Sequence, residues 1–182
     1  MRITGGHYKN RKLFVPEGKD VRPTSDRMRQ SLFNMLHHSS WAQPFEFEGI
    51  RVLDLFCGTG ALGLEALSHG AAHCLFIDTD IYAVQRNTAF LDNDQFRVVR
   101  ASALKFGKGQ ADIDLVFMDP PYRQDLVEPT VDNLIDKNWL ADGALVIIET
   151  ERRLTLKTCL DPIEIKHQGQ SSLQIFTYNA QA

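Results

Sequence analysis

The sequence predicts an α/β fold in which helices cover a mostly parallel sheet. From residue 51 onward, short apolar runs alternate with segments of helical periodicity, the pattern of strand–helix–strand units. The last two strand-like segments instead alternate polar and apolar residues across a short turn with glycine, which indicates an antiparallel hairpin at one sheet edge. We therefore expect a main domain at 49–182, preceded by an N-terminal extension at 1–48.

The main domain is expected to contain seven strands. Apolar runs of strand length predict five parallel strands, at 51–56, 74–77, 96–99, 113–118 and 144–148. The two strands of the hairpin are expected at 163–166 and 173–178. Helices are expected at 61–69, at 80–91 and near 127–135, with Gly70 ending the first helix and Asp80 capping the second.

The N-terminal extension is expected to be an extended arm followed by one helix. Residues 1–23 hold several Gly and Pro and only short apolar pieces, so they do not suggest an independent domain. Thr24, Ser25 and Asp26 can cap a helix. Apolar residues then recur at helical spacing, at Met28, Leu32, Met35 and Leu36. Three arginines are expected near the exposed start of this helix: Arg22, Arg27 and Arg29.

The charge of the chain is unevenly distributed. Residues 1–38 carry eight Lys or Arg against three Asp or Glu, a net charge of +5. Since the whole chain carries −3, the remainder carries −8. A basic arm on an acidic body favours contact with a polyanion such as a nucleic acid, and the alternative is a merely solvated arm.

Other features exclude several classes of protein. The three cysteines form no C-x-x-C pair and the histidines show no ligand spacing, so we expect a reduced compartment and no metal. The N-terminus lacks the apolar core of a signal peptide, and no apolar run approaches the length of a membrane span. The protein is expected to be cytoplasmic.

A glycine turn follows the first strand of the main domain. Residues 58–63 read G-x-G-x-x-G, and Asp78 stands twenty positions after Gly58, where an acid that binds ribose belongs. Such a turn suits any cofactor that contains a nucleoside. Asp54, inside the strand end, would face a cationic group better than a pyrophosphate, and too little chain follows for a dehydrogenase. S-adenosylmethionine satisfies both points, although Asp54 could instead cap the following helix.

A second motif, Asp119-Pro120-Pro121-Tyr122, follows the fourth strand. Open α/β sheets bind ligands at the carboxyl ends of their strands. Prolines lack N–H groups, so this corner presents acceptors, and the carboxylate of Asp119 adds more. Tyr122 offers a flat face to a planar ring. The motif is therefore typical of a pocket for an aromatic amine such as the exocyclic amine of a nucleobase, or else it is a proline-rich turn with a surface aspartate.

With these motifs the chain resembles the class I S-adenosylmethionine-dependent methyltransferases, whose fold is Rossmann-like. Asp54-Leu55-Phe56-Cys57-Gly58-Thr59-Gly60 is similar to their first cofactor motif, and Asp119-Pro120-Pro121-Tyr122 to the motif of members that methylate amino groups. Arg2-Ile3-Thr4-Gly5-Gly6, Arg11-Lys12-Leu13 and the segment from Arg22 to Arg29 further resemble the N-terminal pattern of the RsmD family. The resemblance covers essentially the whole chain.

The resemblance implies transfer of a methyl group to N2 of a guanine in small-subunit (16S) ribosomal RNA. The protein is expected to be a monomer. It implies cofactor contacts by Asp54, Phe56, Cys57, Gly58, Thr59, Gly60, Asp78, Ser102 and Ala103. It implies catalysis by Asp119, Pro120, Pro121 and Tyr122. It implies RNA contacts by Arg2, Arg11, Lys12, Arg22, Thr24, Arg27 and Arg29. The chain departs from the family at Gln30, where Glu is frequent, and at Ser102, where Asp or Asn commonly contacts the adenine.

Three alternatives stay open at this point. An adenine-N6 methyltransferase can use the same Asp-Pro-Pro-Tyr motif, although it usually needs a target-recognition region for which this chain has no spare residues. Protein-glutamine methyltransferases resemble the Asn form of the motif. A non-catalytic RNA-binding assembly factor could retain the fold, but the intact Asp54 and Asp119 motifs argue against it.

Overall fold

The computed structural model describes residues 1–17, 26–38, 46–121, 125–152 and 154–180. Four helices and seven strands are assigned among these residues. In chain order they are α1 (Asp26–His38), β1 (Arg51–Leu55), α2 (Ala61–Ser68), β2 (His73–Asp78), α3 (Tyr82–Thr88), β3 (Phe96–Arg100), β4 (Ile113–Met118), α4 (Val127–Asp136), β5 (Leu140–Glu151), β6 (Asp161–Gln168) and β7 (Ser171–Thr177).

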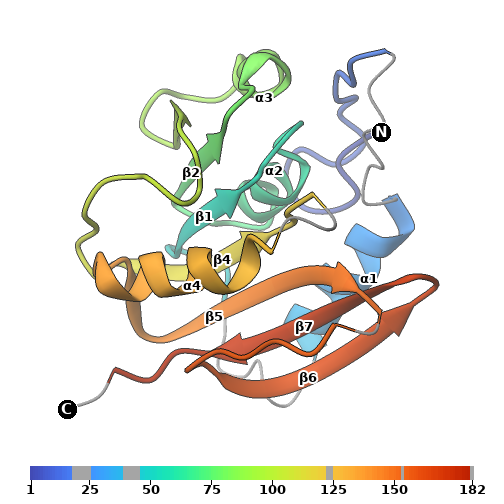
Figure 1. Cartoon of the computed structure of the whole chain (residues 1–182). Coiled ribbons are helices and arrows are strands. Elements are labelled where there is room, and N and C mark those ends of the chain that lie inside the picture. The colour runs from blue at the N-terminus through green and yellow to red at the C-terminus, as the bar shows by residue number, and fades with distance from the viewer. Residues whose placement is uncertain (18–25, 39–45, 122–124, 153, 181–182) are drawn as a thin grey trace.

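The strands form one sheet in the order β3-β2-β1-β4-β5-β7-β6. The first five strands are parallel, whereas β7 is antiparallel to both β5 and β6. Strand order reverses between β1 and β4, which therefore flank the switch point of the sheet (Figure 1). The expected mostly parallel sheet with a C-terminal hairpin is confirmed.

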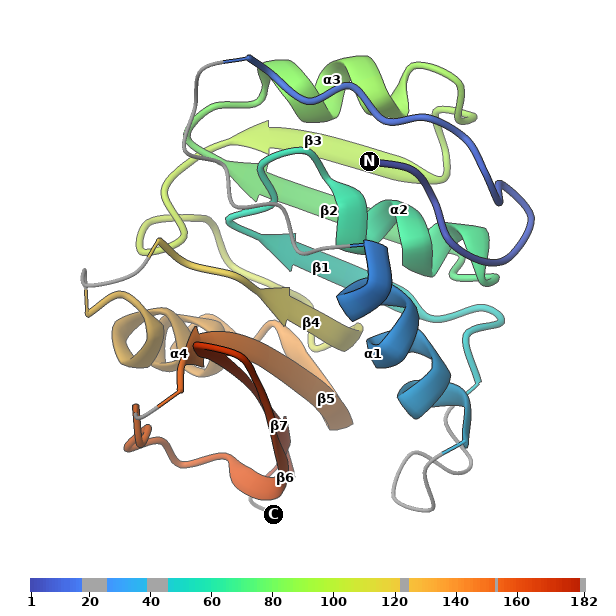
Figure 2. The same ribbon diagram turned by 90° about the vertical axis from the view of Figure 1, so that its right-hand side faces the viewer.

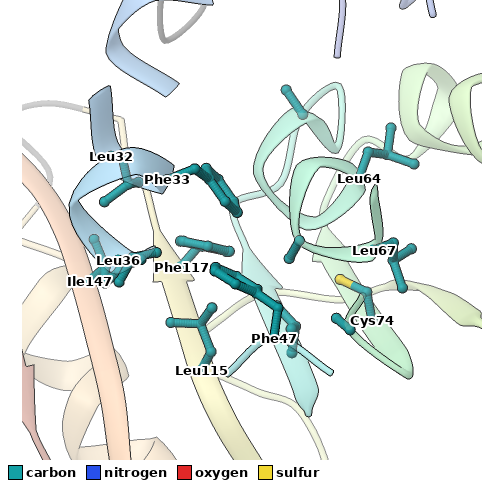
Figure 3. Close-up of a cluster of buried hydrophobic side chains, with 14 of the residues drawn as sticks. Leu32, Phe33, Leu36, Phe47, Leu64, Leu67, Cys74, Leu115, Phe117 and Ile147 are labelled. Carbon is teal, nitrogen blue, oxygen red and sulfur yellow. The ribbon is translucent and has the colours of Figure 1, made fainter. Parts of the chain in front are cut away.

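Helices cover both faces of the sheet (Figure 2). On one face, α1 and α2 pack against apolar side chains of β1, β4 and β5. Figure 3 shows part of this core, where Leu32, Phe33 and Leu36 of α1 meet Phe117 of β4. On the opposite face, the apolar side of α4 packs with alternate residues of the same strands. Because successive strand residues point to opposite faces, both faces of the central strands are buried.

The N-terminal arm shares the core of the main domain. Ile3 is fully buried and Leu13 nearly so, in the same cluster as α1 and the sheet. The Glu65 carboxylate on α2 accepts hydrogen bonds from the backbone N–H of Thr4 at 2.9 Å and of Gly5 at 2.7 Å. The arm and α1 are therefore packed onto the sheet as parts of one structure.

Arg29 corrects one expectation from the sequence. Its side chain is fully buried, and its guanidinium lies 3.5 Å from the Glu65 carboxylate and 2.8 Å from that of Asp26. A buried cation needs such partners because leaving water is costly. The prediction that Arg29 stays exposed near the start of α1 is wrong, so Arg29 cannot contact RNA in the folded chain.

Two element boundaries also differ from expectation. Helix α3 ends at Thr88, where the backbone N–H of Leu91 bonds the Thr88 carbonyl at 2.9 Å and closes a turn of four residues. Strand β5 extends from Leu140 to Glu151, because it pairs with β4 on one side and with β7 on the other. Pairing on both sides extends the strand beyond its apolar run.

Candidate active site

The predicted motifs meet at one edge of the sheet. Asp78, Asp54 and Asp119 stand at or just after the carboxyl ends of β2, β1 and β4, which are neighbours in that order. The β1 and β4 ends flank the switch point, where open α/β sheets bind their ligands. The structure thus brings the two motifs side by side, although they are more than sixty positions apart in the sequence.

The glycine loop turns sharply between β1 and α2. Phe56, Gly58 and Gly60 all have positive φ angles, of 57°, 52° and 75°. A side chain on Gly60 would meet Val84 at 2.7 Å, whereas one on Gly58 would meet only the Phe56 carbonyl at 4.0 Å. The space beside Gly58 is therefore open, so a ligand can approach the backbone closely there.

Asp54 is a buried carboxylate behind this loop. It is 2% exposed, and its Oδ2 accepts a hydrogen bond from the backbone N–H of Gly63, in the first turn of α2, at 2.9 Å. Burial, together with the nearby charge of Asp78, raises the pKa of Asp54 to about 7, against the opposing effect of the Gly63 hydrogen bond. Asp54 therefore caps α2, and a cationic group of a cofactor would stabilise its charged form.

Asp78 holds the loop from the other side. Its Oδ2 accepts a hydrogen bond from the backbone N–H of Gly58 at 2.8 Å, and its Oδ1 one from that of Asp80 at 2.9 Å. The side chain is half-buried, so it can still meet a ligand. Asp78 therefore shapes the loop in addition to the ribose contact expected of it, a role that spacing alone does not reveal.

Cys57 and Thr59 are the polar side chains of the turn itself. Cys57 is buried, and burial with the nearby charges of Asp54 and Asp78 raises the pKa of its thiol well above the usual value. A thiol whose pKa is raised by burial is a poor nucleophile. Thr59 is also buried, and its carbonyl accepts a hydrogen bond from Asn87 Nδ2 on α3 at 2.9 Å.

The loop after β3 lies beside Asp78. The backbone N–H of Ala101 bonds the Asp78 carbonyl at 3.0 Å, which brings Ser102 and Ala103 to the same edge of the sheet. The Ser102 hydroxyl accepts a hydrogen bond from the N–H of Leu104 at 3.2 Å, and Ala103 is buried. That these two residues contact the adenine of the cofactor stays a prediction.

A cavity of about 240 Å³ lies beside the two prolines that follow Asp119. Asp119 is half-buried and Pro120 is buried, whereas Pro121 is exposed. The two prolines line one side of the cavity, and its other walls come from the start of α4, the end of β5 and the segment after β5. The cavity is slightly smaller than typical sites for drug-sized ligands, which suits one planar ring system. Tyr122 lies outside the described residues.

The predicted RNA contacts are distributed over the arm and α1. Arg2, Arg11, Lys12 and Arg27 are exposed, as a contact with a large partner requires. The Arg11 guanidinium lies 3.5 Å from the centre of the Phe90 ring. Arg22 and Thr24 lie outside the described residues, and Arg29 is buried as described above.

Asn87 is the site residue that the sequence analysis missed. It is 5% exposed on α3 and bonds both the arm and the glycine loop. The signal available in the sequence was a polar residue in the middle of an apolar helical pattern. Such a signal indicates that the side chain has partners, but it does not identify them.

Metal ligands and membrane spans were searched for among the described residues. There, no three or more His, Cys, Asp or Glu side chains gather as metal ligands would. No helix in this part of the chain is long and apolar enough to cross a bilayer.

Comparison with known proteins identifies the family. The model of the family described as "Conserved hypothetical protein 95" matches residues 1–177, nearly the whole chain. The chain belongs to this family, the RsmD family. Membership agrees with the resemblance carried by the two motifs and by the N-terminal pattern.

Two curated relatives of this RsmD family member are named ribosomal RNA small subunit methyltransferase D. The one from Escherichia coli K12 is 43% identical over 156 residues, which cover 83% of this chain and 75% of the relative. The one from Haemophilus influenzae is 35% identical over 166 residues, covering 87% and 82%.

Solved structures agree with this family placement. A structure described as the putative methyltransferase yhhF from E. coli has a TM-score of 0.84 at 39% identity, and covers 100% of this chain and 99% of its own. The N-methyltransferase NodS from Bradyrhizobium japonicum, at 16% identity and a TM-score of 0.65, covers 89% of this chain and 100% of its own, and shows the shared fold alone. The fold is that of the class I methyltransferases.

Proposed function

We propose that this protein transfers a methyl group from S-adenosylmethionine to N2 of a guanine in small-subunit ribosomal RNA. The observation that carries the proposal is the Asp119-Pro120-Pro121 corner, which follows β4, the strand next to β1 and its glycine loop, and whose two prolines line a cavity. The names of the two curated relatives support the ribosomal RNA substrate. A monomer acting on the small subunit or an assembly intermediate is part of the same proposal.

The residues at the ends of β1 and β2 fit the cofactor. The open space beside Gly58 admits a ligand next to the backbone, and the half-buried carboxylate of Asp78, which accepts the Gly58 N–H, supports the proposed contact with ribose hydroxyls. Asp54 has a raised pKa and lies behind the loop, where a positive charge on the ligand would be favourable. When bound, S-adenosylmethionine supplies a methyl group already activated by its sulfonium.

The corner after β4 supplies what the target amine needs. The lone pair of an exocyclic amine is delocalised into the base, so the enzyme must orient the nitrogen and stabilise the positive charge that develops on it. The carboxylate of Asp119 and the carbonyl of Pro120 are acceptors for the two amine hydrogens. Asp119 or water takes the released proton. Tyr122 is expected to stack on the base, which must leave its helical stack to enter the cavity.

The test is to identify the methylated nucleoside. The purified protein is incubated with labelled S-adenosylmethionine and small ribosomal subunits from a strain that lacks the enzyme, and the RNA is then digested to nucleosides. We expect the label in N2-methylguanosine. Label in N6-methyladenosine would transfer the assignment to the adenine-N6 alternative. Cofactor binding without any labelled RNA would favour the non-catalytic assembly factor.

A further inference from the structure

The part of the N-terminal arm that contains Phe14 lies along helix α3 (Figure 2). The Oδ1 atom of Asn87 accepts a hydrogen bond from the N–H of Phe14 at 2.7 Å, and its Nδ2 donates one to the Phe14 carbonyl at 3.0 Å. This buried amide bonds the arm backbone as a neighbouring strand would. Asn87 therefore sets the position of this part of the arm on α3.

The arm and α3 together build a surface on which aromatic rings and guanidinium groups alternate. Tyr82, Arg86 and Phe90 recur every four positions, so they lie along one side of α3 and its end. The Arg86 guanidinium lies 4.0 Å from the centre of the Phe14 ring and donates a hydrogen bond to the Tyr82 hydroxyl at 3.2 Å. We call this the arm–α3 surface; it consists of Tyr8, Arg11, Phe14, Tyr82, Arg86 and Phe90.

The arm–α3 surface is accessible. The Tyr82 side chain is 55% exposed, which is unusual for an aromatic residue, and Arg11 and Arg86 are both exposed. The rings and guanidinium groups contact one another, which holds them in place, while Tyr8, Phe14 and Phe90 are half-buried beneath the exposed residues. A preorganised surface of this kind loses little conformational entropy when a partner binds.

The charge of the surface indicates a polyanion. Residues 1–17 carry four Lys or Arg and one acid, and α3 carries Arg86 and no acid, although the whole chain has a net charge of −3. The carboxylate of nearby Asp80 already accepts the N–H of Tyr82 at 3.1 Å. A basic surface with aromatic rings on an acidic protein suits nucleic acid better than it suits an acidic or apolar protein partner.

We infer that the arm–α3 surface binds an unpaired segment of the substrate RNA that flanks the target nucleotide. Bases stack on the exposed faces of aromatic rings and guanidinium groups, and phosphates pair with the arginines. A duplex would bury its base faces and offer this surface only its backbone. Tyr82 follows β2 by four positions, so the surface begins at the same sheet edge as the candidate active site.

This inference rests on the proposed function, because it takes RNA as the substrate. It also assigns Tyr82 and Arg86, which are distant in sequence from the basic arm, as contacts with the RNA. Neither residue belongs to the two motifs of the active site.

The experiment measures binding of a fluorescent unpaired RNA of about ten nucleotides at several salt concentrations. Tyr82→Ala should weaken binding roughly tenfold, because one stacked base is lost, and should leave the salt dependence unchanged. Arg86→Ala should also reduce the slope of log affinity against log salt by about 0.7. Arg86→Lys should keep that slope but lose affinity, because lysine lacks the planar guanidinium.

Lys137→Ala is the matched control, since it removes one exposed positive charge at the end of α4 on the other face of the sheet. It should bind like wild type. Wild-type affinity and salt slope in both Tyr82→Ala and Arg86→Ala would overturn the inference. Equal competition by a duplex of the same length would also overturn it. So would a Tyr82→Ala protein that loses affinity for S-adenosylmethionine alone, because Tyr82 would then be an adenine contact.

Methyl transfer by the wild-type protein is measured in parallel, so that the proposed function and the RNA-binding role of the arm–α3 surface are tested independently. Transfer to guanine together with unchanged RNA binding by the variants overturns the surface alone. Weakened RNA binding by the variants, with no transfer by the wild type, overturns the proposed function and supports the surface.

Discussion

Asp54 ties the stability of the protein to pH. Its pKa is near 7 in the folded chain because it is buried, against an ordinary value of 3.8. Between these values the folded state binds more protons than the unfolded state, so stability is lost as the pH rises towards 7. We expect the free energy of unfolding to fall by up to about 1.4 kcal/mol per pH unit in this window.

Denaturant unfolding of the ligand-free protein between pH 5 and pH 8 measures this slope. Asp54→Asn is the matched variant, because an amide can still accept the Gly63 N–H but does not titrate. The slope should be markedly smaller in the variant. Identical slopes in the two proteins would show that Asp54 does not titrate in this window.

Asp119 is expected to control the methyl-transfer step. Asp119→Ala removes the acceptor for the target amine and should lower the single-turnover rate about 100-fold or more. Asp119→Asn can still accept a hydrogen bond but carries no charge, so it should retain more activity than Ala and less than wild type. Cofactor and RNA affinities should stay near normal, which places the loss on the chemical step. Equal rates in all three proteins would show that the Asp119 corner is only a turn without a role in methyl transfer.

At the scale of the elements, Gly63 allows α2 to pack closely against β2. A side chain here would meet Phe76 at 2.4 Å and Cys74 at 2.5 Å. Replacing a helical glycine with alanine alone gains about 1 kcal/mol, but overpacking a core costs about 1–3 kcal/mol. Because both contacts are severe, we expect the cost of overpacking to exceed the gain in helix propensity. Gly63→Ala should therefore unfold at a lower urea concentration than wild type.

Gly107→Ala is the matched control, because a side chain there would meet nothing within 4 Å. Its unfolding midpoint should stay close to that of wild type. A Gly63→Ala protein that is as stable as wild type would mean that α2 can move away from β2 without loss.

Much of the arrangement of elements could be predicted from the sequence, because strand and helix patterns follow local periodicity. The apolar runs located the strands, and the parallel order placed Asp54, Asp78 and Asp119 at one edge of the sheet. The ends of α3 and β5 could not be predicted, since they depend on a turn bond and on pairing with β7. Pairing between strands is a property of the folded sheet.

The site was predictable only where its residues belong to a motif. Asn87 bonds residues that are 73 and 28 positions away, and Arg29 is paired with Glu65 of α2. Helical spacing places Arg29 on the apolar side of α1 with Leu32 and Leu36, but it does not identify the acid that would pair with a buried arginine. That partner, Glu65, depends on where the helix docks.

At the scale of the whole molecule, Glu65 joins the arm, α1 and α2. It accepts bonds from Thr4 and Gly5 and pairs with the buried guanidinium of Arg29. Glu65→Ala would leave that cation and the arm N–H groups without this partner, and breaking a buried pair in this way costs about 3–5 kcal/mol. We expect a correspondingly large loss of stability and rapid proteolysis of the arm.

Glu65→Gln separates charge from hydrogen bonding in the same experiment. The amide oxygen can still accept from the arm, so this variant should be intermediate in stability and in the rate at which protease cleaves residues 1–17. If Glu65→Ala is as stable as wild type and its arm resists proteolysis equally, the arm does not depend on Glu65.

The three hydrogen bonds of Asn87 have a consequence for how the two ligands bind. One amide joins the Phe14 backbone of the arm to the Thr59 carbonyl of the glycine loop. A ligand that orders one of these segments also orders the other, so binding of the second ligand costs less conformational entropy. By thermodynamic reciprocity, RNA must then tighten cofactor binding by the same factor as the cofactor tightens RNA binding. We expect a factor of about five or more, measured as the cofactor Kd with and without RNA, and a factor near one in Asn87→Ala. If the wild-type cofactor Kd is the same with and without RNA, the two segments respond independently.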